Sequence, residues 1–243
     1  MADMHKIAPI FSGWQETLIW SCLQGCMGYV VADDNENPSA AQIVVGDFCF
    51  FAGTPSPALA AQAAAPIVIP RNEEWGKIIE AVFGERVEKA LRYAIKKEPD
   101  VFNSDRLNEY IKSLPKAFAL RPLDKEIYDC VHHENWSKDF CAQFADYDDY
   151  RKRGLGFVVT YQGRPVSGAS SYTVYNGGIE IEIDTKSEFR QRGLAAACGA
   201  RLILECLKRG LYPSWDAHDL RSVALAQKLG YHMDYPYTVY IKK

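Results

Sequence analysis

Residues 179–195 read IEIEIDTKSEFRQRGLA, and this stretch decides the fold. Its first part alternates isoleucine with acidic residues, which predicts a half-buried β-strand over 179–185. A loop with two arginines and Gly193 follows, and it leads directly into an alanine-rich helix predicted over 193–208. The start of such a helix directs unpaired backbone N–H groups and a partial positive charge at one point. Because Gly193 has no Cβ, its backbone can be approached closely, and we expect an anion site that suits a pyrophosphate.

The elements on both sides of this stretch predict a mixed α/β arrangement. Before it, we expect a strand over 117–123, helices over 125–133 and 137–150, and strands over 156–162 and 166–175. After it, we expect a strand over 212–218, a helix over 221–229 and a final strand over 235–241. The predicted order is therefore β-α-α-β-β-β-α-β-α-β.

The first part of the chain predicts a separate α/β unit. We expect a helix over 9–24, a hairpin built from 29–32 and 42–52, a short strand over 67–69, and helices over 72–83, 85–97 and 105–113. Pro115 closes this region, because proline disfavours continuation of a helix. The predicted domains are residues 1–114 and 115–243, and we find no catalytic motif in the first.

Composition argues against several classes of protein. The 243 residues are 48% hydrophobic and 24% charged, with a formal net charge of −3, which is ordinary for a globular protein. The mixed charges give no basic footprint for nucleic acid. Neither a run of roughly 20 apolar residues nor a signal peptide is apparent, so we expect a cytoplasmic protein that binds no membrane. The seven cysteines lack metal-ligand spacing, and we expect no metal.

Two blocks of sequence resemble the GNAT superfamily of acyl-CoA-dependent N-acetyltransferases. The letters RQRGLA at 190–195 resemble the acetyl-CoA pyrophosphate signature of that family, written Q/R-x-x-G-x-G/A. The second block, within 215–231, ends in KLGY and is similar to the family's fifth strand and the helix after it. Residues 117–123 resemble its first strand, so the resemblance covers about half the chain. Within the superfamily, the chain is similar to the zwittermicin-resistance-like acetyltransferases.

The resemblance implies both a fold and a reaction. The fold is a central mixed, mostly antiparallel sheet flanked by helices. The reaction transfers an acetyl or other acyl group from acetyl-CoA to a primary amine of a small molecule or peptide by direct attack. The pantetheine would lie between the fourth and fifth strands, which are parallel but splay. The implied cofactor-binding residues are Ile183, Asp184, Thr185, Arg190, Gln191, Arg192, Gly193, Leu194, Ala195, Asp219 and Ser222.

A base for the acceptor amine is expected on the fourth strand. An alkyl amine with a pKa near 10 is only about one part in a thousand neutral at pH 7, a handicap of roughly 4 kcal/mol. Glu182 is the first candidate for this base and Glu180 the second, with Asp184 and His218 behind them. The same alternation is also typical of a strand whose acids merely face solvent, so a structural role for Glu182 stays open.

Many GNAT enzymes use a tyrosine to protonate the leaving thiolate, and this tyrosine has no counterpart here. Ala226 stands at its position, and Ser222 and Tyr231 are the candidate substitutes. A thiolate with a reference pKa near 8.5 can alternatively leave without a fixed acid. The missing tyrosine motivates a second hypothesis, a protein that binds or senses acyl-CoA without turnover. A third treats residues 1–114 as a degenerate GNAT-like half used for packing or homodimerisation.

Overall fold

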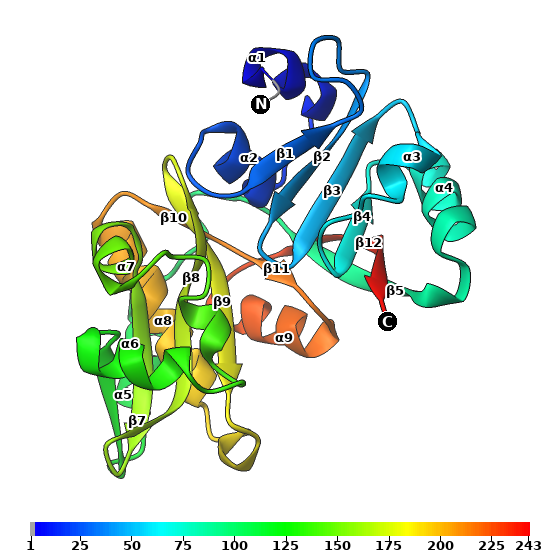
Figure 1. The fold of residues 1–243 in the computed structure, drawn as a ribbon. Coiled ribbons are helices and arrows are strands. Elements are labelled where there is room, and N and C mark those ends of the chain that lie inside the picture. The colour runs from blue at the N-terminus through cyan, green and yellow to red at the C-terminus, as the bar shows by residue number, and fades with distance from the viewer. Residues whose placement is uncertain (1–2) are drawn as a thin grey trace. The chain divides into compact units, whose positions relative to one another are not determined.

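The computed structural model describes residues 3–243, and these form two compact units (Figure 1). Unit 1 contains the chain up to Arg92 together with residues 236–243, and unit 2 contains residues 93–235. These units divide the chain differently from the domains 1–114 and 115–243 that the sequence indicates.

Two long strands cross from one unit to the other along the chain. β5 (Val87–Ile95) leads from unit 1 into unit 2, and β12 (Met233–Lys242) leads back into unit 1. Unit 1 therefore contains a C-terminal segment, residues 236–243, that is distant in sequence from the rest of the unit, whereas unit 2 is one continuous stretch. Such long-range pairing leaves no local signal in the sequence, and for this reason the boundary was expected elsewhere.

The sheet of unit 2 has the strand order β10-β9-β8-β7-β6. Its strands are β6 (Phe118–Pro122), β7 (Gly156–Tyr161), β8 (Arg164–Tyr175), β9 (Gly178–Thr185) and β10 (Tyr212–Ser214). The strands from β6 to β9 form an antiparallel meander, and β10 lies parallel to β9. The sheet is therefore mixed and mostly antiparallel, as predicted.

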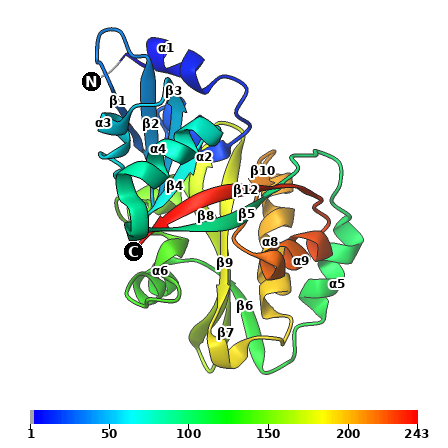
Figure 2. The same cartoon turned by 90° about the vertical axis from the view of Figure 1, so that its right-hand side faces the viewer.

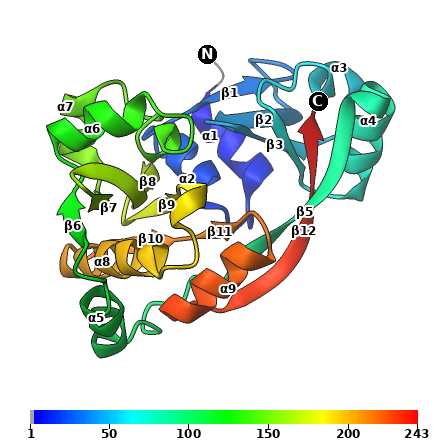
Figure 3. The same cartoon turned by 90° about the horizontal axis from the view of Figure 1, so that it is seen from below.

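Helices cover both faces of this sheet (Figure 3). α8 (Leu194–Lys208) packs against β7, β8 and β9 on one face. On the other face, α6 (Lys125–His132) and a 3-10 turn at Lys138–Phe140 pack against β8.

The alternation along β9 decides which side chains face α8. A Cβ on Gly199 of α8 would lie 3.3 Å from the Ile183 side chain, so the isoleucines face this helix. On the opposite face, a Cβ on Gly168 would collide with the ring of Phe140. Gly168 is the register partner of Asp184, so the acidic residues of β9 share the face on which Phe140 lies.

Two further helices flank α8 (Figure 2). They are α5 (Ser104–Lys112) and α9 (Leu220–Leu229), and both pack against α8. Tyr110 Oη of α5 donates a hydrogen bond of 3.0 Å to the Lys228 carbonyl of α9. α5 therefore belongs to unit 2, although the sequence indicates it as part of the N-terminal domain.

The strand predicted over 212–218 is broken at Trp215. Its second part, β11 (Asp216–Ala217), pairs antiparallel with Tyr93 and Ala94 of β5 instead of continuing beside β9. β10 itself pairs with β9 only as far as Glu180. The two parallel strands therefore diverge beyond Glu180, as the resemblance to the GNAT family implies.

Unit 1 shares one run of elements with unit 2, namely a three-stranded meander, a helix, a strand parallel to the last strand of the meander, and a second helix. Its strands are β1 (Tyr29–Ala32), β2 (Ala40–Val45), β3 (Phe48–Gly53) and β4 (Ile67–Pro70), of which the first three form an antiparallel meander and β4 lies parallel to β3. α3 (Pro57–Ala60) precedes β4 and α4 (Glu73–Phe83) follows it. Tyr240 of β12 pairs with β4, and Trp75 and Phe51 are buried in the core of this unit.

Two helices predicted in the N-terminal region are wrong. Residues 85–97 form β5, because pairing with neighbouring strands overrides the helical preference of their Glu, Lys, Ala and Leu residues. The helix predicted over 9–24 is divided into α1 (Met4–Ile7), a 3-10 turn and α2 (Thr17–Leu23). Gly13 lies between these pieces with a φ of +71°, which a continuous helix does not allow.

Two other boundaries differ from the sequence-based expectation. The run over 42–52 contains two strands, because the chain turns at Gly46 with a φ of +55°. The helix predicted over 137–150 begins late, and α7 spans Tyr147–Arg153. Asp146 caps α7 by accepting a hydrogen bond from the Asp149 N–H, which gives the helix its true start.

Candidate active site

The loop between β9 and α8 has the backbone of an anion-binding site. α8 begins at Leu194 after Gly193, whose φ is +78°, and within residues 3–243 no side chain caps this helix. Gln191 also has a positive φ of +61°, a conformation that non-glycine residues seldom adopt and that is frequent at functional sites. A Cβ on Gly193 would meet no atom within 4 Å, so the space beside the loop is open. The loop therefore fits an anionic group such as a pyrophosphate.

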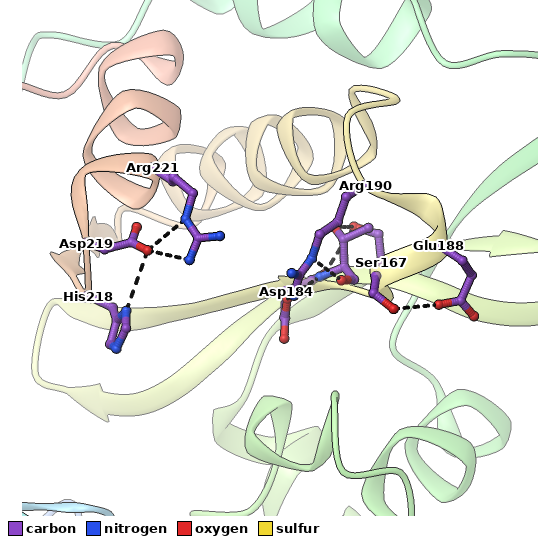
Figure 4. A network of polar contacts seen from close by, with 9 residues as sticks. Ser167, Asp184, Glu188, Arg190, His218, Asp219 and Arg221 are labelled. Atoms are coloured by element: carbon purple, nitrogen blue, oxygen red, sulfur yellow. Dashed lines mark hydrogen bonds and ion pairs between the residues drawn. The ribbon is translucent and has the colours of Figure 1, made fainter.

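Arg190 ties this loop to the end of β9 (Figure 4). Its Nε donates to the Thr185 carbonyl at 3.2 Å, and its Nη2 lies 3.6 Å from Asp184 Oδ1. The same Asp184 oxygen accepts the Thr185 N–H at 2.6 Å. The Arg190 side chain is still 55% exposed, so it can face a bound anion while it holds the loop. The structure thus brings the predicted residues Asp184, Thr185 and Arg190 together.

Ser167 supports the same corner and was not found from the sequence. It is fully buried, and its hydroxyl donates to the Asp184 carbonyl at 3.2 Å and lies 2.7 Å from Thr185 Oγ1. Ser167 is the register partner of Thr185 across β8 and β9. The cross-strand register brings Ser167 to the site, and one serine among the three of β8 carries no signal of this role in the sequence.

One edge of β9 is left open where the loop begins. Ile183, Asp184 and Thr185 pair with β8 on one side. On their other side, β10 pairs only up to Glu180, and no other strand of the described chain takes its place. The predicted pantetheine-binding residues therefore lie on a strand edge beside the helix start, an arrangement that suits an extended chain with amide groups.

The three acids of β9 have different surroundings. Glu180 is only 5% exposed, whereas Glu182 and Asp184 are half-buried. Glu180 lies among tyrosines: burial raises the pKa of Tyr212 to about 12, and the Glu180 carboxylate adds to that rise. Burial also raises the pKa of Tyr231, with a further contribution from the Glu180 charge. Glu182 is therefore the more accessible of the two candidate bases.

Asp219 and its neighbours form a second polar group, at the start of α9 (Figure 4). Asp219 caps the helix by accepting the Ser222 N–H at 2.9 Å, and its other oxygen accepts Arg221 Nη2 at 2.6 Å. These bonds, with that from the Ser222 N–H the strongest cause, lower the pKa of Asp219. Ser222 Oγ accepts the Trp215 indole N–H at 3.0 Å. His218 is 72% exposed and 3.8 Å from Asp219, so no tight contact orients it as a base.

Ala226 stands where many GNAT enzymes have the tyrosine that protonates the thiolate, and an alanine side chain has no proton to donate. Ala226 is 0% exposed inside α9. Tyr231 is also buried, and its hydroxyl donates to the Pro213 carbonyl at 2.6 Å. The Tyr231 proton is thus engaged by the backbone, and burial raises the pKa of this phenol, so the geometry argues against Tyr231 as the substitute acid. Ser222, which is half-buried, remains a candidate.

The cysteines are free thiols in this structure. Cys130 is exposed, Cys26 is half-buried and the other five are buried. Within residues 3–243, no group of three or more His, Cys, Asp or Glu side chains lies close enough to hold a metal ion. The same part of the chain contains no helix long and apolar enough to cross a membrane.

Comparison with known proteins gives consistent matches. The family model described as GNAT acetyltransferase matches residues 8–240. The chain is 42% identical to a GCN5-related N-acetyltransferase-like protein from Streptococcus suis 89/1591, and the structures agree with a TM-score of 0.95 over 99% of this chain and 98% of that chain. A GCN5-related N-acetyltransferase from Kribbella flavida, at 13% identity, has a TM-score of 0.56 over 99% of this chain and 96% of that chain, which shows a shared fold.

One curated relative is similar over part of its length. The Bacillus subtilis (strain 168) protein named uncharacterized N-acetyltransferase YdfB is 28% identical over 178 residues, which are 70% of this chain and 63% of that protein. None of these relatives bears the name of the zwittermicin-resistance-like group, so that assignment stays a prediction.

Proposed function

The chain belongs to the GNAT acetyltransferase family, and from this premise we propose that it transfers an acetyl group from acetyl-CoA to a primary amine of a small molecule or peptide. Membership supports N-acetyltransferase activity in general, and the mixed sheet flanked by helices is the predicted fold. The observation that carries the finer proposal is the uncapped start of α8 beside the open edge of β9. The roles of individual residues below are part of the proposal.

The residues proposed to bind acetyl-CoA lie in the loop before α8 and in the first turn of that helix. Gln191, Gly193, Leu194 and Ala195 would offer backbone N–H groups to the pyrophosphate, because they form the loop and the first turn of α8. Arg190 and Arg192, both exposed, would add positive charge.

The pantetheine is proposed to lie along Ile183, Asp184 and Thr185, like an added strand. An N–H group of this edge would polarise the thioester carbonyl, and one such preorganised donor is worth roughly 10²- to 10³-fold in rate. Asp219 and Ser222 form the polar group at the start of α9, and they are proposed to contact the cofactor as well.

Glu182 is proposed as the base that takes a proton from the acceptor amine, with Glu180 as the second choice. Glu182 lies on the acidic face of β9 and is more exposed than Glu180, so an amine can approach it from solvent. Neutralising the amine at pH 7 otherwise costs roughly 4 kcal/mol. Ser222 is proposed as the group that donates a proton to the leaving thiolate, because it is half-buried at the start of α9 whereas the Tyr231 hydroxyl is engaged by the backbone. Alternatively, a thiolate with a reference pKa near 8.5 leaves without a fixed acid and takes its proton from solvent.

A second function is favoured by one specific observation. Ala226 is fully buried where many GNAT enzymes place a tyrosine, so the fixed acid for the thiolate is missing. A protein that binds or senses acyl-CoA without turnover would need no such acid. Tight binding of acetyl-CoA together with no transfer to any amine would favour this function.

The test separates binding from turnover. Ala195 lies half-buried in the first turn of α8, so Ala195→Glu adds a negative charge next to the proposed pyrophosphate without backbone strain. A carboxylate in that turn is compatible with the helix dipole, so we expect the variant to fold. Titration calorimetry with acetyl-CoA should show binding by the wild type, binding by the neutral control Ala195→Gln, and at least about 100-fold weaker binding by Ala195→Glu.

The outcomes divide the hypotheses. If the wild type does not bind acetyl-CoA, the proposed function is wrong. If it binds, release of CoA is measured with a broad panel of primary amines, on the wild type and on Glu182→Gln. Turnover that Glu182→Gln abolishes supports the enzyme with Glu182 as base, whereas binding without turnover supports the sensing protein.

The remaining parts of the proposal concern unit 1 and the setting of the protein. Unit 1 is proposed as a degenerate GNAT-like half used for packing or for a homodimer. A cytoplasmic location, with no nucleic-acid or membrane partner, is proposed from the sequence alone. Gel filtration with light scattering tests the dimer.

A further inference from the structure

Lys186 is the first residue after β9, and two side chains from a distant segment hold its ammonium group. Lys186 Nζ lies 2.6 Å from Glu134 Oε2 and 5.4 Å from the centre of the Trp136 ring. The Trp136 indole N–H donates to the same Glu134 oxygen at 2.7 Å. We call these three residues, Lys186, Glu134 and Trp136, the lysine clamp.

The lysine clamp is shielded from water on the lysine side. The Lys186 side chain is 21% exposed, and the hydrogen bond from Lys186 is the largest cause of the lowered pKa of Glu134. Trp136 packs edge-on against the buried ring of Phe140, which anchors the segment on the acidic face of the sheet. Packing on Phe140 thus positions Trp136, and the Trp136 indole N–H in turn orients the Glu134 carboxylate toward Lys186.

The backbone of Lys186 begins the turn that leads into the proposed pyrophosphate loop. Its N–H donates to the Val166 carbonyl at 2.9 Å, which continues the pairing of β9 with β8. Its carbonyl accepts the Phe189 N–H at 2.9 Å, which closes the turn just before Arg190. These two backbone hydrogen bonds of Lys186 thus set the direction in which the chain leaves β9 and enters the loop at Arg190.

We infer that Lys186 is a positioning residue for acyl-CoA, held by Glu134 and Trp136 so that the loop over 190–193 is preformed. The inference rests on the proposed function, because it assigns the loop to the cofactor. The segment containing Glu134 and Trp136 then contributes to cofactor affinity without touching the cofactor. Preorganisation of this kind improves binding because less conformational freedom is lost when the ligand binds.

A competing role for Lys186 predicts the opposite sign for one variant. If Lys186 were itself a phosphate ligand, Glu134 would compete with the cofactor for the ammonium group. Removing the Glu134 charge would then leave acetyl-CoA affinity unchanged or raise it. If the lysine clamp positions the loop, removing that charge weakens binding.

The experiment measures the Kd of acetyl-CoA by titration calorimetry for the wild type, Glu134→Gln, Lys186→Met and the double variant. We expect about a fivefold weaker Kd for each single variant, in line with the loss of one partly shielded ion pair, and no further loss in the double variant. Lys186→Arg should restore most of the affinity, because a guanidinium can pair with Glu134 as well. Lys138→Met, at an exposed lysine of the same segment, is the matched control for loss of one positive charge.

A kinetic readout separates positioning from a general loss of structure. With the lysine clamp broken, the KM for acetyl-CoA should rise about fivefold, whereas kcat at saturating acetyl-CoA and the KM of the amine stay within twofold of wild type. Equal or tighter acetyl-CoA binding by Glu134→Gln overturns the inference and leaves the proposed function standing. Absence of acetyl-CoA binding by the wild type overturns both.

Discussion

The two units share one run of elements but differ at the start of the helix that follows their meander. In each, an antiparallel meander leads through a helix to a strand parallel to the last strand of the meander. In unit 2 that helix is α8, with fifteen residues, Gly193 as N-cap and no capping side chain. In unit 1 it is α3, with four residues, and Ser56 Oγ accepts the Leu59 N–H at 3.3 Å. In unit 1 a side chain thus satisfies one of the backbone N–H groups at the helix start, whereas in unit 2 no side chain does so.

The parallel strands separate early in unit 2, whereas in unit 1 they stay paired to the end of β4. In unit 2, β9 and β10 diverge beyond Glu180. In unit 1, β3 and β4 stay paired to Pro70, and the Arg71 N–H continues the pairing by donating to the Phe51 carbonyl at 2.9 Å. The buried Trp75 then donates its indole N–H to the Gly53 carbonyl at 3.0 Å.

The comparison separates a fold from a site. A topology is compatible with many functions, and the function depends on which backbone groups and side chains are left available. β3 is made entirely of apolar residues and glycine, FCFFAG over 48–53, whereas β9 carries three carboxylates. Next to its parallel strand pair, unit 2 has a helix start without a capping side chain, an open strand edge and three carboxylates on β9. This contrast supports the proposal that unit 1 is a degenerate half.

The largest effect is expected from the carboxylates that distinguish β9 from β3. Glu182→Gln removes the proposed base while it keeps the shape of the side chain, and kcat should fall by roughly 10²- to 10⁴-fold. The Kd of acetyl-CoA, measured by calorimetry, should stay within twofold, because the base is assigned to the acceptor. Glu109→Gln, on the exposed surface of α5, is the control and should retain wild-type rates. A kcat of Glu182→Gln within tenfold of wild type would transfer the role to Glu180 or remove it from the strand.

The local features of this site were predictable from the sequence. The strand over 179–185 and the helix from 194 onward were predicted within a residue, because alternation and the glycine with its flanking arginines lie in one short segment. Ser167 and the lysine clamp were missed, since Ser167 reaches Thr185 only through the register of two strands. Contacts between residues far apart in sequence depend on pairing that a single sequence does not display.

The second largest effect is expected from Trp75, whose indole N–H donates to the Gly53 carbonyl at the end of β3. Trp75→Phe keeps a large ring in the core but removes the indole N–H, so the Gly53 carbonyl loses its donor. The free energy of unfolding should fall by about 1–3 kcal/mol, as is usual when a hydrogen-bonded group inside a protein loses its partner. Urea unfolding measures the loss, and calorimetry should show an unchanged acetyl-CoA Kd. Weaker acetyl-CoA binding by this variant would contradict the proposal that acetyl-CoA binds to unit 2.

The third effect separates backbone strain from cofactor binding at the start of α8. Gly193 and Gly163 have φ values of +78° and +79°, and a Cβ on either would meet no atom within 4 Å. Alanine at each position should therefore cost about the same, roughly 1–2 kcal/mol of stability, from the left-handed backbone alone. Only Gly193→Ala should also weaken acetyl-CoA binding, by about tenfold, because its methyl group lies where the pyrophosphate is proposed. Equal acetyl-CoA affinity in the two variants would show that Gly193 serves the turn and not the cofactor.

The overall division of the chain was the hardest feature to predict. Residues 87–95 contain good helix formers and were predicted as helix, yet they form β5. Tyr240 pairs with Val68, so the last strand completes a sheet that begins near the N-terminus. Both features depend on strand pairing inside one sheet, and the pairing partner of a strand is chosen by the whole fold and not by its own residues.

The smallest effect concerns the N-caps of the helices that follow the parallel strands. These caps are Asn72 in α4 and Asp219 in α9. The pKa of Asp219 lies below its ordinary value, so ionised Asp219 contributes stability above about pH 4, and this contribution is lost as the pH falls through the folded-state pKa. Asp219→Asn keeps the cap oxygen but loses the charge that pairs with Arg221. Wild type should be more stable by about 0.5–1 kcal/mol at pH 7, and the difference should vanish near pH 2, as measured by urea unfolding across that range. A difference that does not change with pH would mean that the Asp219 charge contributes nothing, and that α9 is held by its cap geometry in the same way as α4.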